Sequence, residues 1–127
     1  MNLANCNITE IARVAYDSLK GISGNLFLFN RPKTHEKMKN FIVVDFPNRI
    51  YNNIANGQTN CVIEVYVKDK NGVPDMPAIS ALQEQIYSRL PISHELCMIC
   101  NPVSQMGGPD NFGFYCLLIY CKVIINN

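Results

Sequence analysis

The sequence predicts an α+β domain, with a mostly antiparallel five-stranded sheet and two helices packed on one of its faces. Three observations support this prediction. Two segments repeat apolar residues every three or four positions, as amphipathic helices do. Five segments are short, rich in β-branched and aromatic residues, and bounded by turn residues. Their order along the chain is helix, three strands, helix, two strands (α-β-β-β-α-β-β), which indicates an α+β architecture.

The first helix is expected to begin after residue 7. Asn7 and Glu10 have the spacing of a capping box. Apolar residues then recur on one side of the helix, at Ile8, Ile11, Ala12, Ala15, Leu19 and Ile22. Gly21 and Gly24 are expected to end it, because glycine adopts the backbone conformation that closes a helix.

Three strands are expected next, at 26–29, 41–46 and 61–67. The polar segment 30–40 between the first two predicts a loop or a hairpin tip. The third strand alternates in part, with apolar residues on one face and Glu64, Tyr66 and Lys68 on the other.

Turn residues then lead into the second helix. Asp75 has the side chain of a helix cap, and Pro77 is tolerated in a first turn. Ile79, Leu82, Ile86 and Leu90 mark the buried stripe of this helix, which Pro91 ends. The last two strands are expected at 95–100 and 112–125, with a loop at 101–111 between them.

Composition limits the classes of protein that remain. The 127 residues form one ordinary domain, 1–127, and 48% hydrophobic against 17% charged residues excludes a disordered chain. A net charge of +1 gives no global attraction to nucleic acid or anionic lipid. The longest apolar run, 114–121, is far shorter than the roughly 20 residues that span a bilayer. Because the N-terminal residues lack the basic and apolar regions of a signal peptide, we expect a soluble, unexported protein.

The strands at 41–46 and 114–125 are apolar on both faces, although two helices can cover only one face of the sheet. The second face therefore needs another cover. Two hypotheses remain open: a second subunit, or the loops 47–60 and 101–111 folding over it. We favour a homo-oligomer, and we expect Tyr66 to be an aromatic member of its subunit contact.

The chain has six cysteines. Cys97 and Cys100, together with Cys116 and Cys121, have the residue types of a four-thiolate zinc site. Within strands, however, separations of three and five residues place side chains on opposite faces. We therefore expect reduced cysteines in the core and neither a metal nor any other cofactor; disulfides would need an oxidising compartment.

Polar residues offer an alternative function. Asp45, Glu64 and Lys68 on neighbouring strands have the residue types of a magnesium-dependent nuclease. Such a site usually places an acid two residues before the lysine, where this chain has Tyr66. We expect a polar strand surface here, with a small metal-dependent nucleic-acid enzyme or nucleic-acid-binding domain as the alternative.

A second polar group is a basic segment, consisting of Arg31, Lys33, Lys37 and Lys39. It could contact phosphates or an acidic partner, although it has no aromatic residue on which a base could stack. The simpler interpretation is a solvated loop, and we do not expect direct nucleic-acid binding. His35 and His94 are both expected in solvent.

The run IEVYVKDKNGVPDMP, followed by a helix ending SRLP, resembles the centre of the tail terminator (tail completion) proteins of long-tailed bacteriophages and prophages. FIVVDFPNRI, a strand closed by proline before a polar loop, is similar to the same families. The resemblance implies a ring, typically of six subunits, that caps the tail tube and meets the head-to-tail connector. It implies no catalytic residues. The expected partners are copies of the chain itself, the tail tube and the connector, in the bacterial cytoplasm during assembly and in the virion.

Overall fold

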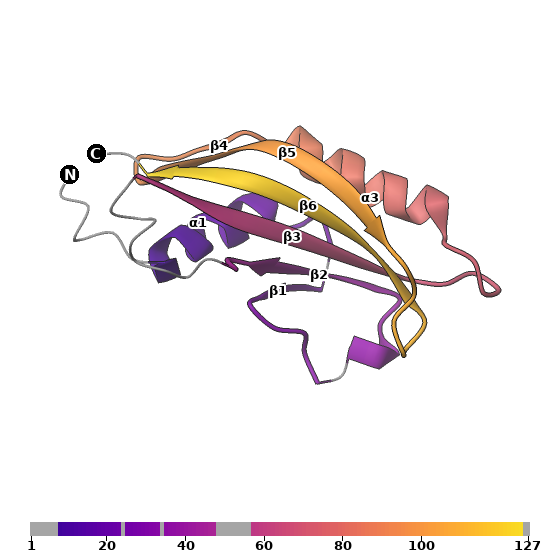
Figure 1. Ribbon diagram of the computed structural model, residues 1–127. Coiled ribbons are helices and arrows are strands. Elements are labelled where there is room, and N and C mark those ends of the chain that lie inside the picture. The colour runs from indigo at the N-terminus through magenta and orange to yellow at the C-terminus, as the bar shows by residue number, and fades with distance from the viewer. Residues whose placement is uncertain (1–7, 24, 34, 48–56, 126–127) are drawn as a thin grey trace.

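The computed structural model describes residues 8–23, 25–33, 35–47 and 57–125. The described residues form two α-helices, one short 3₁₀ helix and six strands (Figure 1). In chain order these are α1 Ile8–Leu19, β1 Leu26–Leu28, η2 His35–Lys37, β2 Asn40–Asp45, β3 Gln58–Lys68, α3 Met76–Ser88, β4 Ile92–Ser93, β5 Cys97–Gly107 and β6 Phe114–Ile125.

All six strands belong to one sheet, in the order β1-β2-β3-β6-β5-β4. Every neighbouring pair is antiparallel except β1 and β2, which are parallel. The predicted α+β class is therefore confirmed, with a mixed sheet of six strands in place of the five mostly antiparallel ones. The long strands β3 and β6 form its centre, and β6 arches together with its neighbour β5 (Figure 1).

The observed strands differ from the predicted ones in three larger respects, apart from shifts of one or two residues at other ends. β4 was not predicted, because its two residues are too few to show a pattern. β5 continues to Gly107, through the segment predicted as a loop. The loop was inferred from Gly-Gly-Pro-Asp at 107–110, which lies at the end of β5 and in the turn after it. Pro102 lies within the strand, at an irregularity in the pairing of β5 with β6, where a strand tolerates a residue without an N–H. β3 begins at Gln58, before the predicted start.

The segment 30–39 is not the tip of a hairpin. Since β1 and β2 run parallel, the chain must leave the sheet after β1 and return to the same end before β2. Phe29 starts this excursion with a positive φ of 72°, and η2 lies within it. In Figure 1 the excursion hangs below the sheet.

Both α-helices pack on the same face of the sheet, as predicted. Buried residues of α1 and α3 join one apolar core with the strand side chains that point to that face. The predicted cap of α3 is also present, because the Asp75 carboxylate accepts a hydrogen bond from Ala78 N at 3.2 Å. The predicted capping box of α1 depends on Asn7, which lies outside the described residues.

The opposite face of the sheet, called here the far face, holds a smaller buried cluster of Phe41, Val43, Tyr66 and Phe114. The segment 27–38 and the turn 108–113 cover it, so the chain itself covers this part of the face. Farther along the same face Val103 is 65% exposed and Tyr120 is 42% exposed. As far as the described residues show, the far face therefore has one closed end and one open end. Most of the loop 47–60, one of the two expected covers of this face, lies outside the described residues.

Among the described residues, the helices are too short or too polar to cross a membrane.

Candidate functional site

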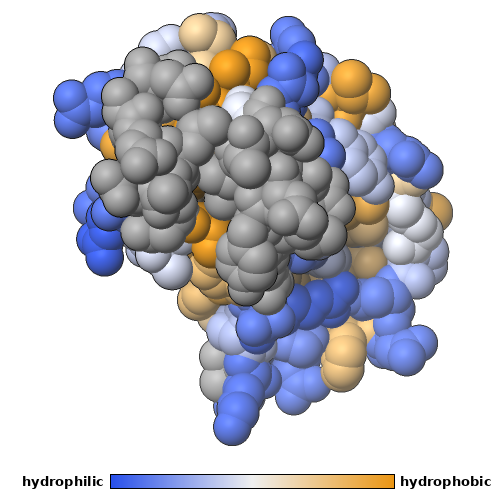
Figure 2. All heavy atoms as spheres, turned by 60° about the vertical axis from the view of Figure 1, so that its left-hand side comes forward, coloured by the Kyte–Doolittle hydropathy of each residue, from blue (hydrophilic) through white to orange (hydrophobic). Residues whose placement is uncertain are grey.

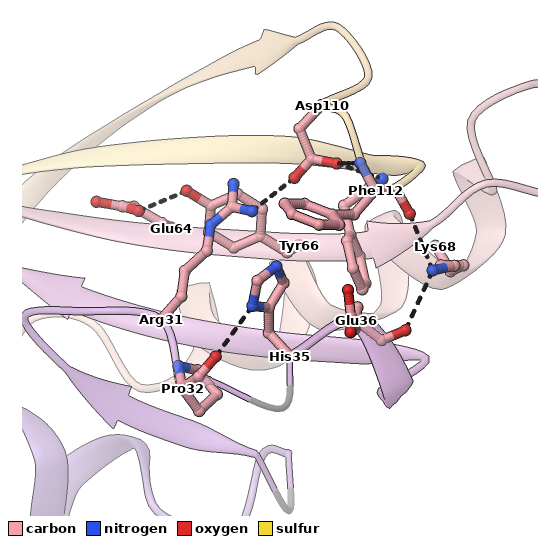
Figure 3. Close-up of polar contacts among 10 residues, drawn as sticks. Arg31, Pro32, His35, Glu36, Glu64, Tyr66, Lys68, Asp110 and Phe112 are labelled. Carbon is pink, nitrogen blue, oxygen red and sulfur yellow. Dashed lines mark hydrogen bonds and ion pairs between the residues drawn. The ribbon is translucent and has the colours of Figure 1, made fainter.

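The polar side chains that drew attention in the sequence gather over the closed end of the far face (Figure 3). Glu64, Tyr66 and Lys68 alternate along β3, so all three point to this face, as predicted. The segment 30–39 contributes Arg31 and His35, and the turn before β6 contributes Asp110. These six residues are called here the far-face clamp: Arg31, His35, Glu64, Tyr66, Lys68 and Asp110.

Arg31 connects the two covering segments. Its Nη1 lies 2.7 Å from Asp110 Oδ2, and its guanidinium carbon lies 4.2 Å from the centre of the Tyr66 ring. Asp110 also accepts hydrogen bonds of 2.9 Å from the backbone N–H groups of Phe112 and Phe114. Partial burial would raise the pKa of Asp110, but these N–H donors and Arg31 outweigh it and hold the pKa below its usual value.

Tyr66 is 8% exposed and lies between Arg31 and Phe41. Its ring stacks on that of Phe41 at 4.6 Å, and its hydroxyl donates a 2.6 Å hydrogen bond to Glu64 Oε1. Burial and the bond to Glu64 raise the pKa of Tyr66 to about 12. Burial also raises the pKa of Glu64, assisted by the charge of Asp45 and opposed by Tyr66 and Arg31. Tyr66 therefore stays protonated at neutral pH and serves as a fixed donor to Glu64.

Lys68 is held by backbone oxygens of both covering segments. Its Nζ donates to Phe112 O at 2.9 Å and to Glu36 O at 3.3 Å, and it lies 4.6 Å from the centre of the Phe114 ring. The Lys68 ammonium group is thus already hydrogen-bonded to the protein. In a nuclease the corresponding lysine would contact a phosphate or a water molecule. Lys68 therefore joins the two segments over Phe114.

His35 packs among aromatic rings, so the prediction that it lies in solvent is wrong. Its ring centre is 4.7 Å from that of Phe112, edge to face, and 5.6 Å from that of Phe41. Its Nδ1 lies 2.9 Å from Pro32 O, which can only accept, so Nδ1 carries the proton in this contact. Its Nε2 is buried with no hydrogen-bond partner in the part of the chain that the structure describes. His35 thus supports the cover by packing, at the cost of one unsatisfied nitrogen.

The alternative nuclease group is not brought together. Asp45 pairs with Val62 across the strands, whereas Lys68 pairs with Phe114. The six residue steps along β3 from Val62 to Lys68 span about 20 Å, at roughly 3.3 Å per residue. Within the described residues, no three histidine, cysteine, aspartate or glutamate side chains lie close enough to hold a metal ion.

One residue of the basic segment belongs to the far-face clamp, and the other three do not. Arg31 is engaged with Asp110 and Tyr66, while Lys33, Lys37 and Lys39 are exposed. Figure 2 shows hydrophilic side chains gathered at the lower end of the molecule, where the segment 30–39 hangs in Figure 1. The three lysines remain available to a polyanion or an acidic partner, as the sequence suggested.

The cysteines of the two predicted pairs lie on opposite faces, as their odd spacing indicated. Cys97 and Cys121 belong to the helix-covered core, whereas Cys116 packs against the far-face cluster and Cys100 pairs with Lys122. Cys61 lies directly across from Cys121, and its hydrogen bond with that thiol, together with burial, raises its pKa. The five described cysteines are free thiols, and Cys6 lies outside the described residues.

An open groove of about 790 Å³ runs over the other end of the far face. Its described lining is apolar or neutral apart from Lys122: Pro47, Gln58, Thr59, Asn60, Val62, Asn101, Val103, Tyr120, Cys121 and Lys122. Carboxylates and imidazoles, the usual general acids and bases, are absent from that lining.

His35 and Asp110 are the clamp residues that the sequence did not single out. Asp110 and Arg31 are 79 positions apart in the chain, and no local sequence pattern predicts a contact over that separation. His35 is surrounded by polar residues in sequence and by rings only after folding.

No protein-family model matches this chain, and no curated protein is significantly similar to it.

Proposed function

We propose that this chain is a non-enzymatic assembly protein of a phage or prophage tail, of the tail-terminator kind. It forms a homo-oligomeric ring that caps the tail tube and joins it to the head connector. The support from sequence is the resemblance of IEVYVKDKNGVPDMP, which is now seen as the end of β3, the turn after it and the first turn of α3. It acts in the bacterial cytoplasm during assembly and afterwards in the virion.

One structural observation carries the proposal: the open end of the far face exposes apolar side chains beside a groove with no acid–base groups in its described lining. Exposed apolar surface of this kind is typical of contacts with other proteins. Tyr66 itself offers little area, because Arg31 and Phe41 enclose its ring. The proposal therefore assigns Val103 and Tyr120 to a contact with another component of the tail, while a direct role for Tyr66 in the subunit contact stays a prediction.

The clamp supports the same conclusion. Glu64, Lys68 and Arg31 are each engaged in contacts that fix the two covering segments to the sheet. A side chain used in this way stabilises a surface, and it is not poised on a substrate. Glu64→Ala and Lys68→Ala should therefore reduce thermal stability without removing a catalytic activity.

Sedimentation at tens of micromolar tests the ring. The expected result is a mass several times the 14.3 kDa of one chain, with rings visible by electron microscopy. Particles from an induced element should contain the chain at the head-to-tail junction. A monomer that cleaves nucleic acid with magnesium, and loses that cleavage in Glu64→Ala, would overturn the proposal in favour of the nuclease.

A further inference from the structure

Among the described strands, the sheet has two edges that lack an outer partner. β4 covers only Met98 and Ile99 of β5, so residues 103–107 of β5 have no described strand on their outer side. At the other end of the sheet, β2 is the only described strand that pairs with β1. Each edge presents backbone N–H and C=O groups to whatever lies beside it.

Neither edge carries a charge. The whole of β5, CMICNPVSQMG, lacks charged residues, and β1 is Leu26, Phe27 and Leu28. Soluble proteins usually protect a free edge with lysine, proline or a bulge. Pro102 and the irregularity beside it protect only the start of the free part of β5. The remaining edge is therefore open to another strand.

The directions of the two edge strands also allow them to pair with each other. β1 runs with β2, and each step from β2 to β3, β6 and β5 reverses direction, so β5 runs opposite to β1. If copies are placed side by side around an axis parallel to the strands, β5 of one copy meets β1 of the next in antiparallel orientation. All helix-covered faces then lie on the same side.

The side chains at the edges are complementary on that side. Met106 pairs with Leu117, a residue of the helix-covered core, so it points to the helix side, and it is 41% exposed. Beside β1, on the same side of the sheet, a groove of about 310 Å³ is mostly apolar but includes one cation; it is lined by Thr9, Ala12, Arg13, Tyr16, Leu28 and Phe29. A methionine is flexible enough to pack on the apolar part of such a groove.

We propose that β5 of one copy adds to β1 of a second copy, with Met106 in the groove between α1 and β1. This inference rests on the proposed ring and names its subunit contact. Because the two surfaces are different, the contact is head-to-tail, and such contacts close into rings when the rotation between copies allows it. Backbone hydrogen bonds between β5 and β1 hold the two copies together, and the lack of charged side chains on both strands permits their close approach.

Val103→Lys tests the β5 edge, because a lysine on an edge strand disfavours the addition of another strand. Val73→Lys is its matched control, since Val73 is 58% exposed and lies in the turn before α3, away from both edges. Both substitutions replace an exposed valine, so both chains should fold. Sedimentation should show at least about a tenfold weaker association for Val103→Lys and no change for Val73→Lys.

A mixing experiment tests the head-to-tail geometry. Tyr16→Lys adds a second charge, beside Arg13, to the β1 groove and leaves β5 intact, while Val103→Lys alters β5 and leaves the groove intact. Circular dichroism should first show that both chains are folded. Each variant alone should be monomeric, and an equimolar mixture should form dimers, because one intact edge of each kind remains.

The outcomes separate this inference from the proposed function. If the wild-type chain assembles and Val103→Lys assembles equally well, the edge contact is wrong and the ring stands. If Tyr16→Lys assembles normally while Val103→Lys does not, β5 pairs with something other than β1. If the wild-type chain remains a monomer up to hundreds of micromolar, the ring and its contact both fail.

Discussion

On the face of the sheet that α1 and α3 cover, the core consists of side chains that strands and helices direct there by their own periodicity. On the far face, four buried side chains are covered by two irregular segments that meet across 79 positions of the chain. The first core needs only regular secondary structure. The second depends on particular polar contacts, above all Arg31 with Asp110 and Lys68 with the carbonyls of Glu36 and Phe112. Packing alone thus accounts for the core on the helix-covered face, whereas the core on the far face also depends on charged side chains.

The largest effect should come from breaking the helix-covered core. Ile86→Asp places an unpaired charge at a residue with no exposed surface, at a cost comparable to the whole stability of a small domain, about 5 kcal/mol or more. The chain should fail to give a cooperative melting transition by circular dichroism. Gln85→Asp, at the neighbouring exposed position of α3, is the control and should melt close to the wild-type temperature. Equal damage from both would mean that the buried side of α3 is wrongly identified.

A smaller loss of stability is expected when a large side chain is removed from the far-face cluster. Phe114 is fully buried, touches Phe41 and lies beneath Lys68, so Phe114→Ala should cost about 3–5 kcal/mol in urea unfolding. Phe112→Ala removes an exposed ring from the same turn and should cost less than about 1.5 kcal/mol. If the two losses were equal, the far face would not hold a core of its own.

Arg31→Met separates charge from packing in the clamp. It keeps an unbranched apolar side chain and removes the ion pair with Asp110 and the cation over Tyr66, at an expected cost of about 1–2 kcal/mol. Arg31→Lys should recover only part of this, because lysine lacks the planar fork of arginine. Lys33→Met, at an exposed position of the same segment, should have no measurable effect on the free energy of unfolding. A cost for Lys33→Met as large as that for Arg31→Met would contradict a specific role of Arg31.

The smallest effect on stability is expected at Glu64, where a substitution should leave the chain unchanged or slightly more stable. Because its pKa is raised in the folded state, the stability that Glu64 contributes is fully present below its unfolded-state pKa and is lost as the pH rises through the folded-state pKa. Glu64→Gln keeps an acceptor for the Tyr66 hydroxyl and should be equally stable or slightly more stable at pH 7, by less than about 1 kcal/mol. Melting temperatures between pH 4 and 8 should show a weaker pH dependence than in the wild-type chain. A marked destabilisation at pH 7 would show that the ionised carboxylate contributes to the clamp.

Much of the fold follows from local patterns. The apolar stripes of α1 and α3 and the alternation of β3 show which side of each element is buried, and Asp75 marks where α3 begins. The sequence also separates the cysteines of each predicted pair, because the strand repeat of two residues is a property of the backbone. A strand too short to show a pattern was missed, as β4 was, and β5 was cut short because the turn residues after it were taken to mark a longer loop.

The candidate site was predicted less completely. Glu64, Tyr66 and Lys68 were correctly placed on one face, since they alternate on one strand. Their partners could not be predicted, because His35 and Asp110 arrive from segments whose paths depend on the parallel pairing of β1 with β2 and on the turn before β6. The same contacts divide the basic segment, engaging Arg31 and leaving its three lysines exposed.

The sequence by itself determined the α+β class, the two amphipathic helices and the orientation of alternating side chains, because each of these is encoded within a few neighbouring residues. Only the tertiary structure decided how the described part of the chain closes the far face at one end and leaves it open at the other. That outcome depends on contacts between distant segments, whose free energy arises only when the whole sheet has formed. For the same reason the two uncharged edges could be recognised as complementary only after the strand order placed them at opposite ends of one sheet.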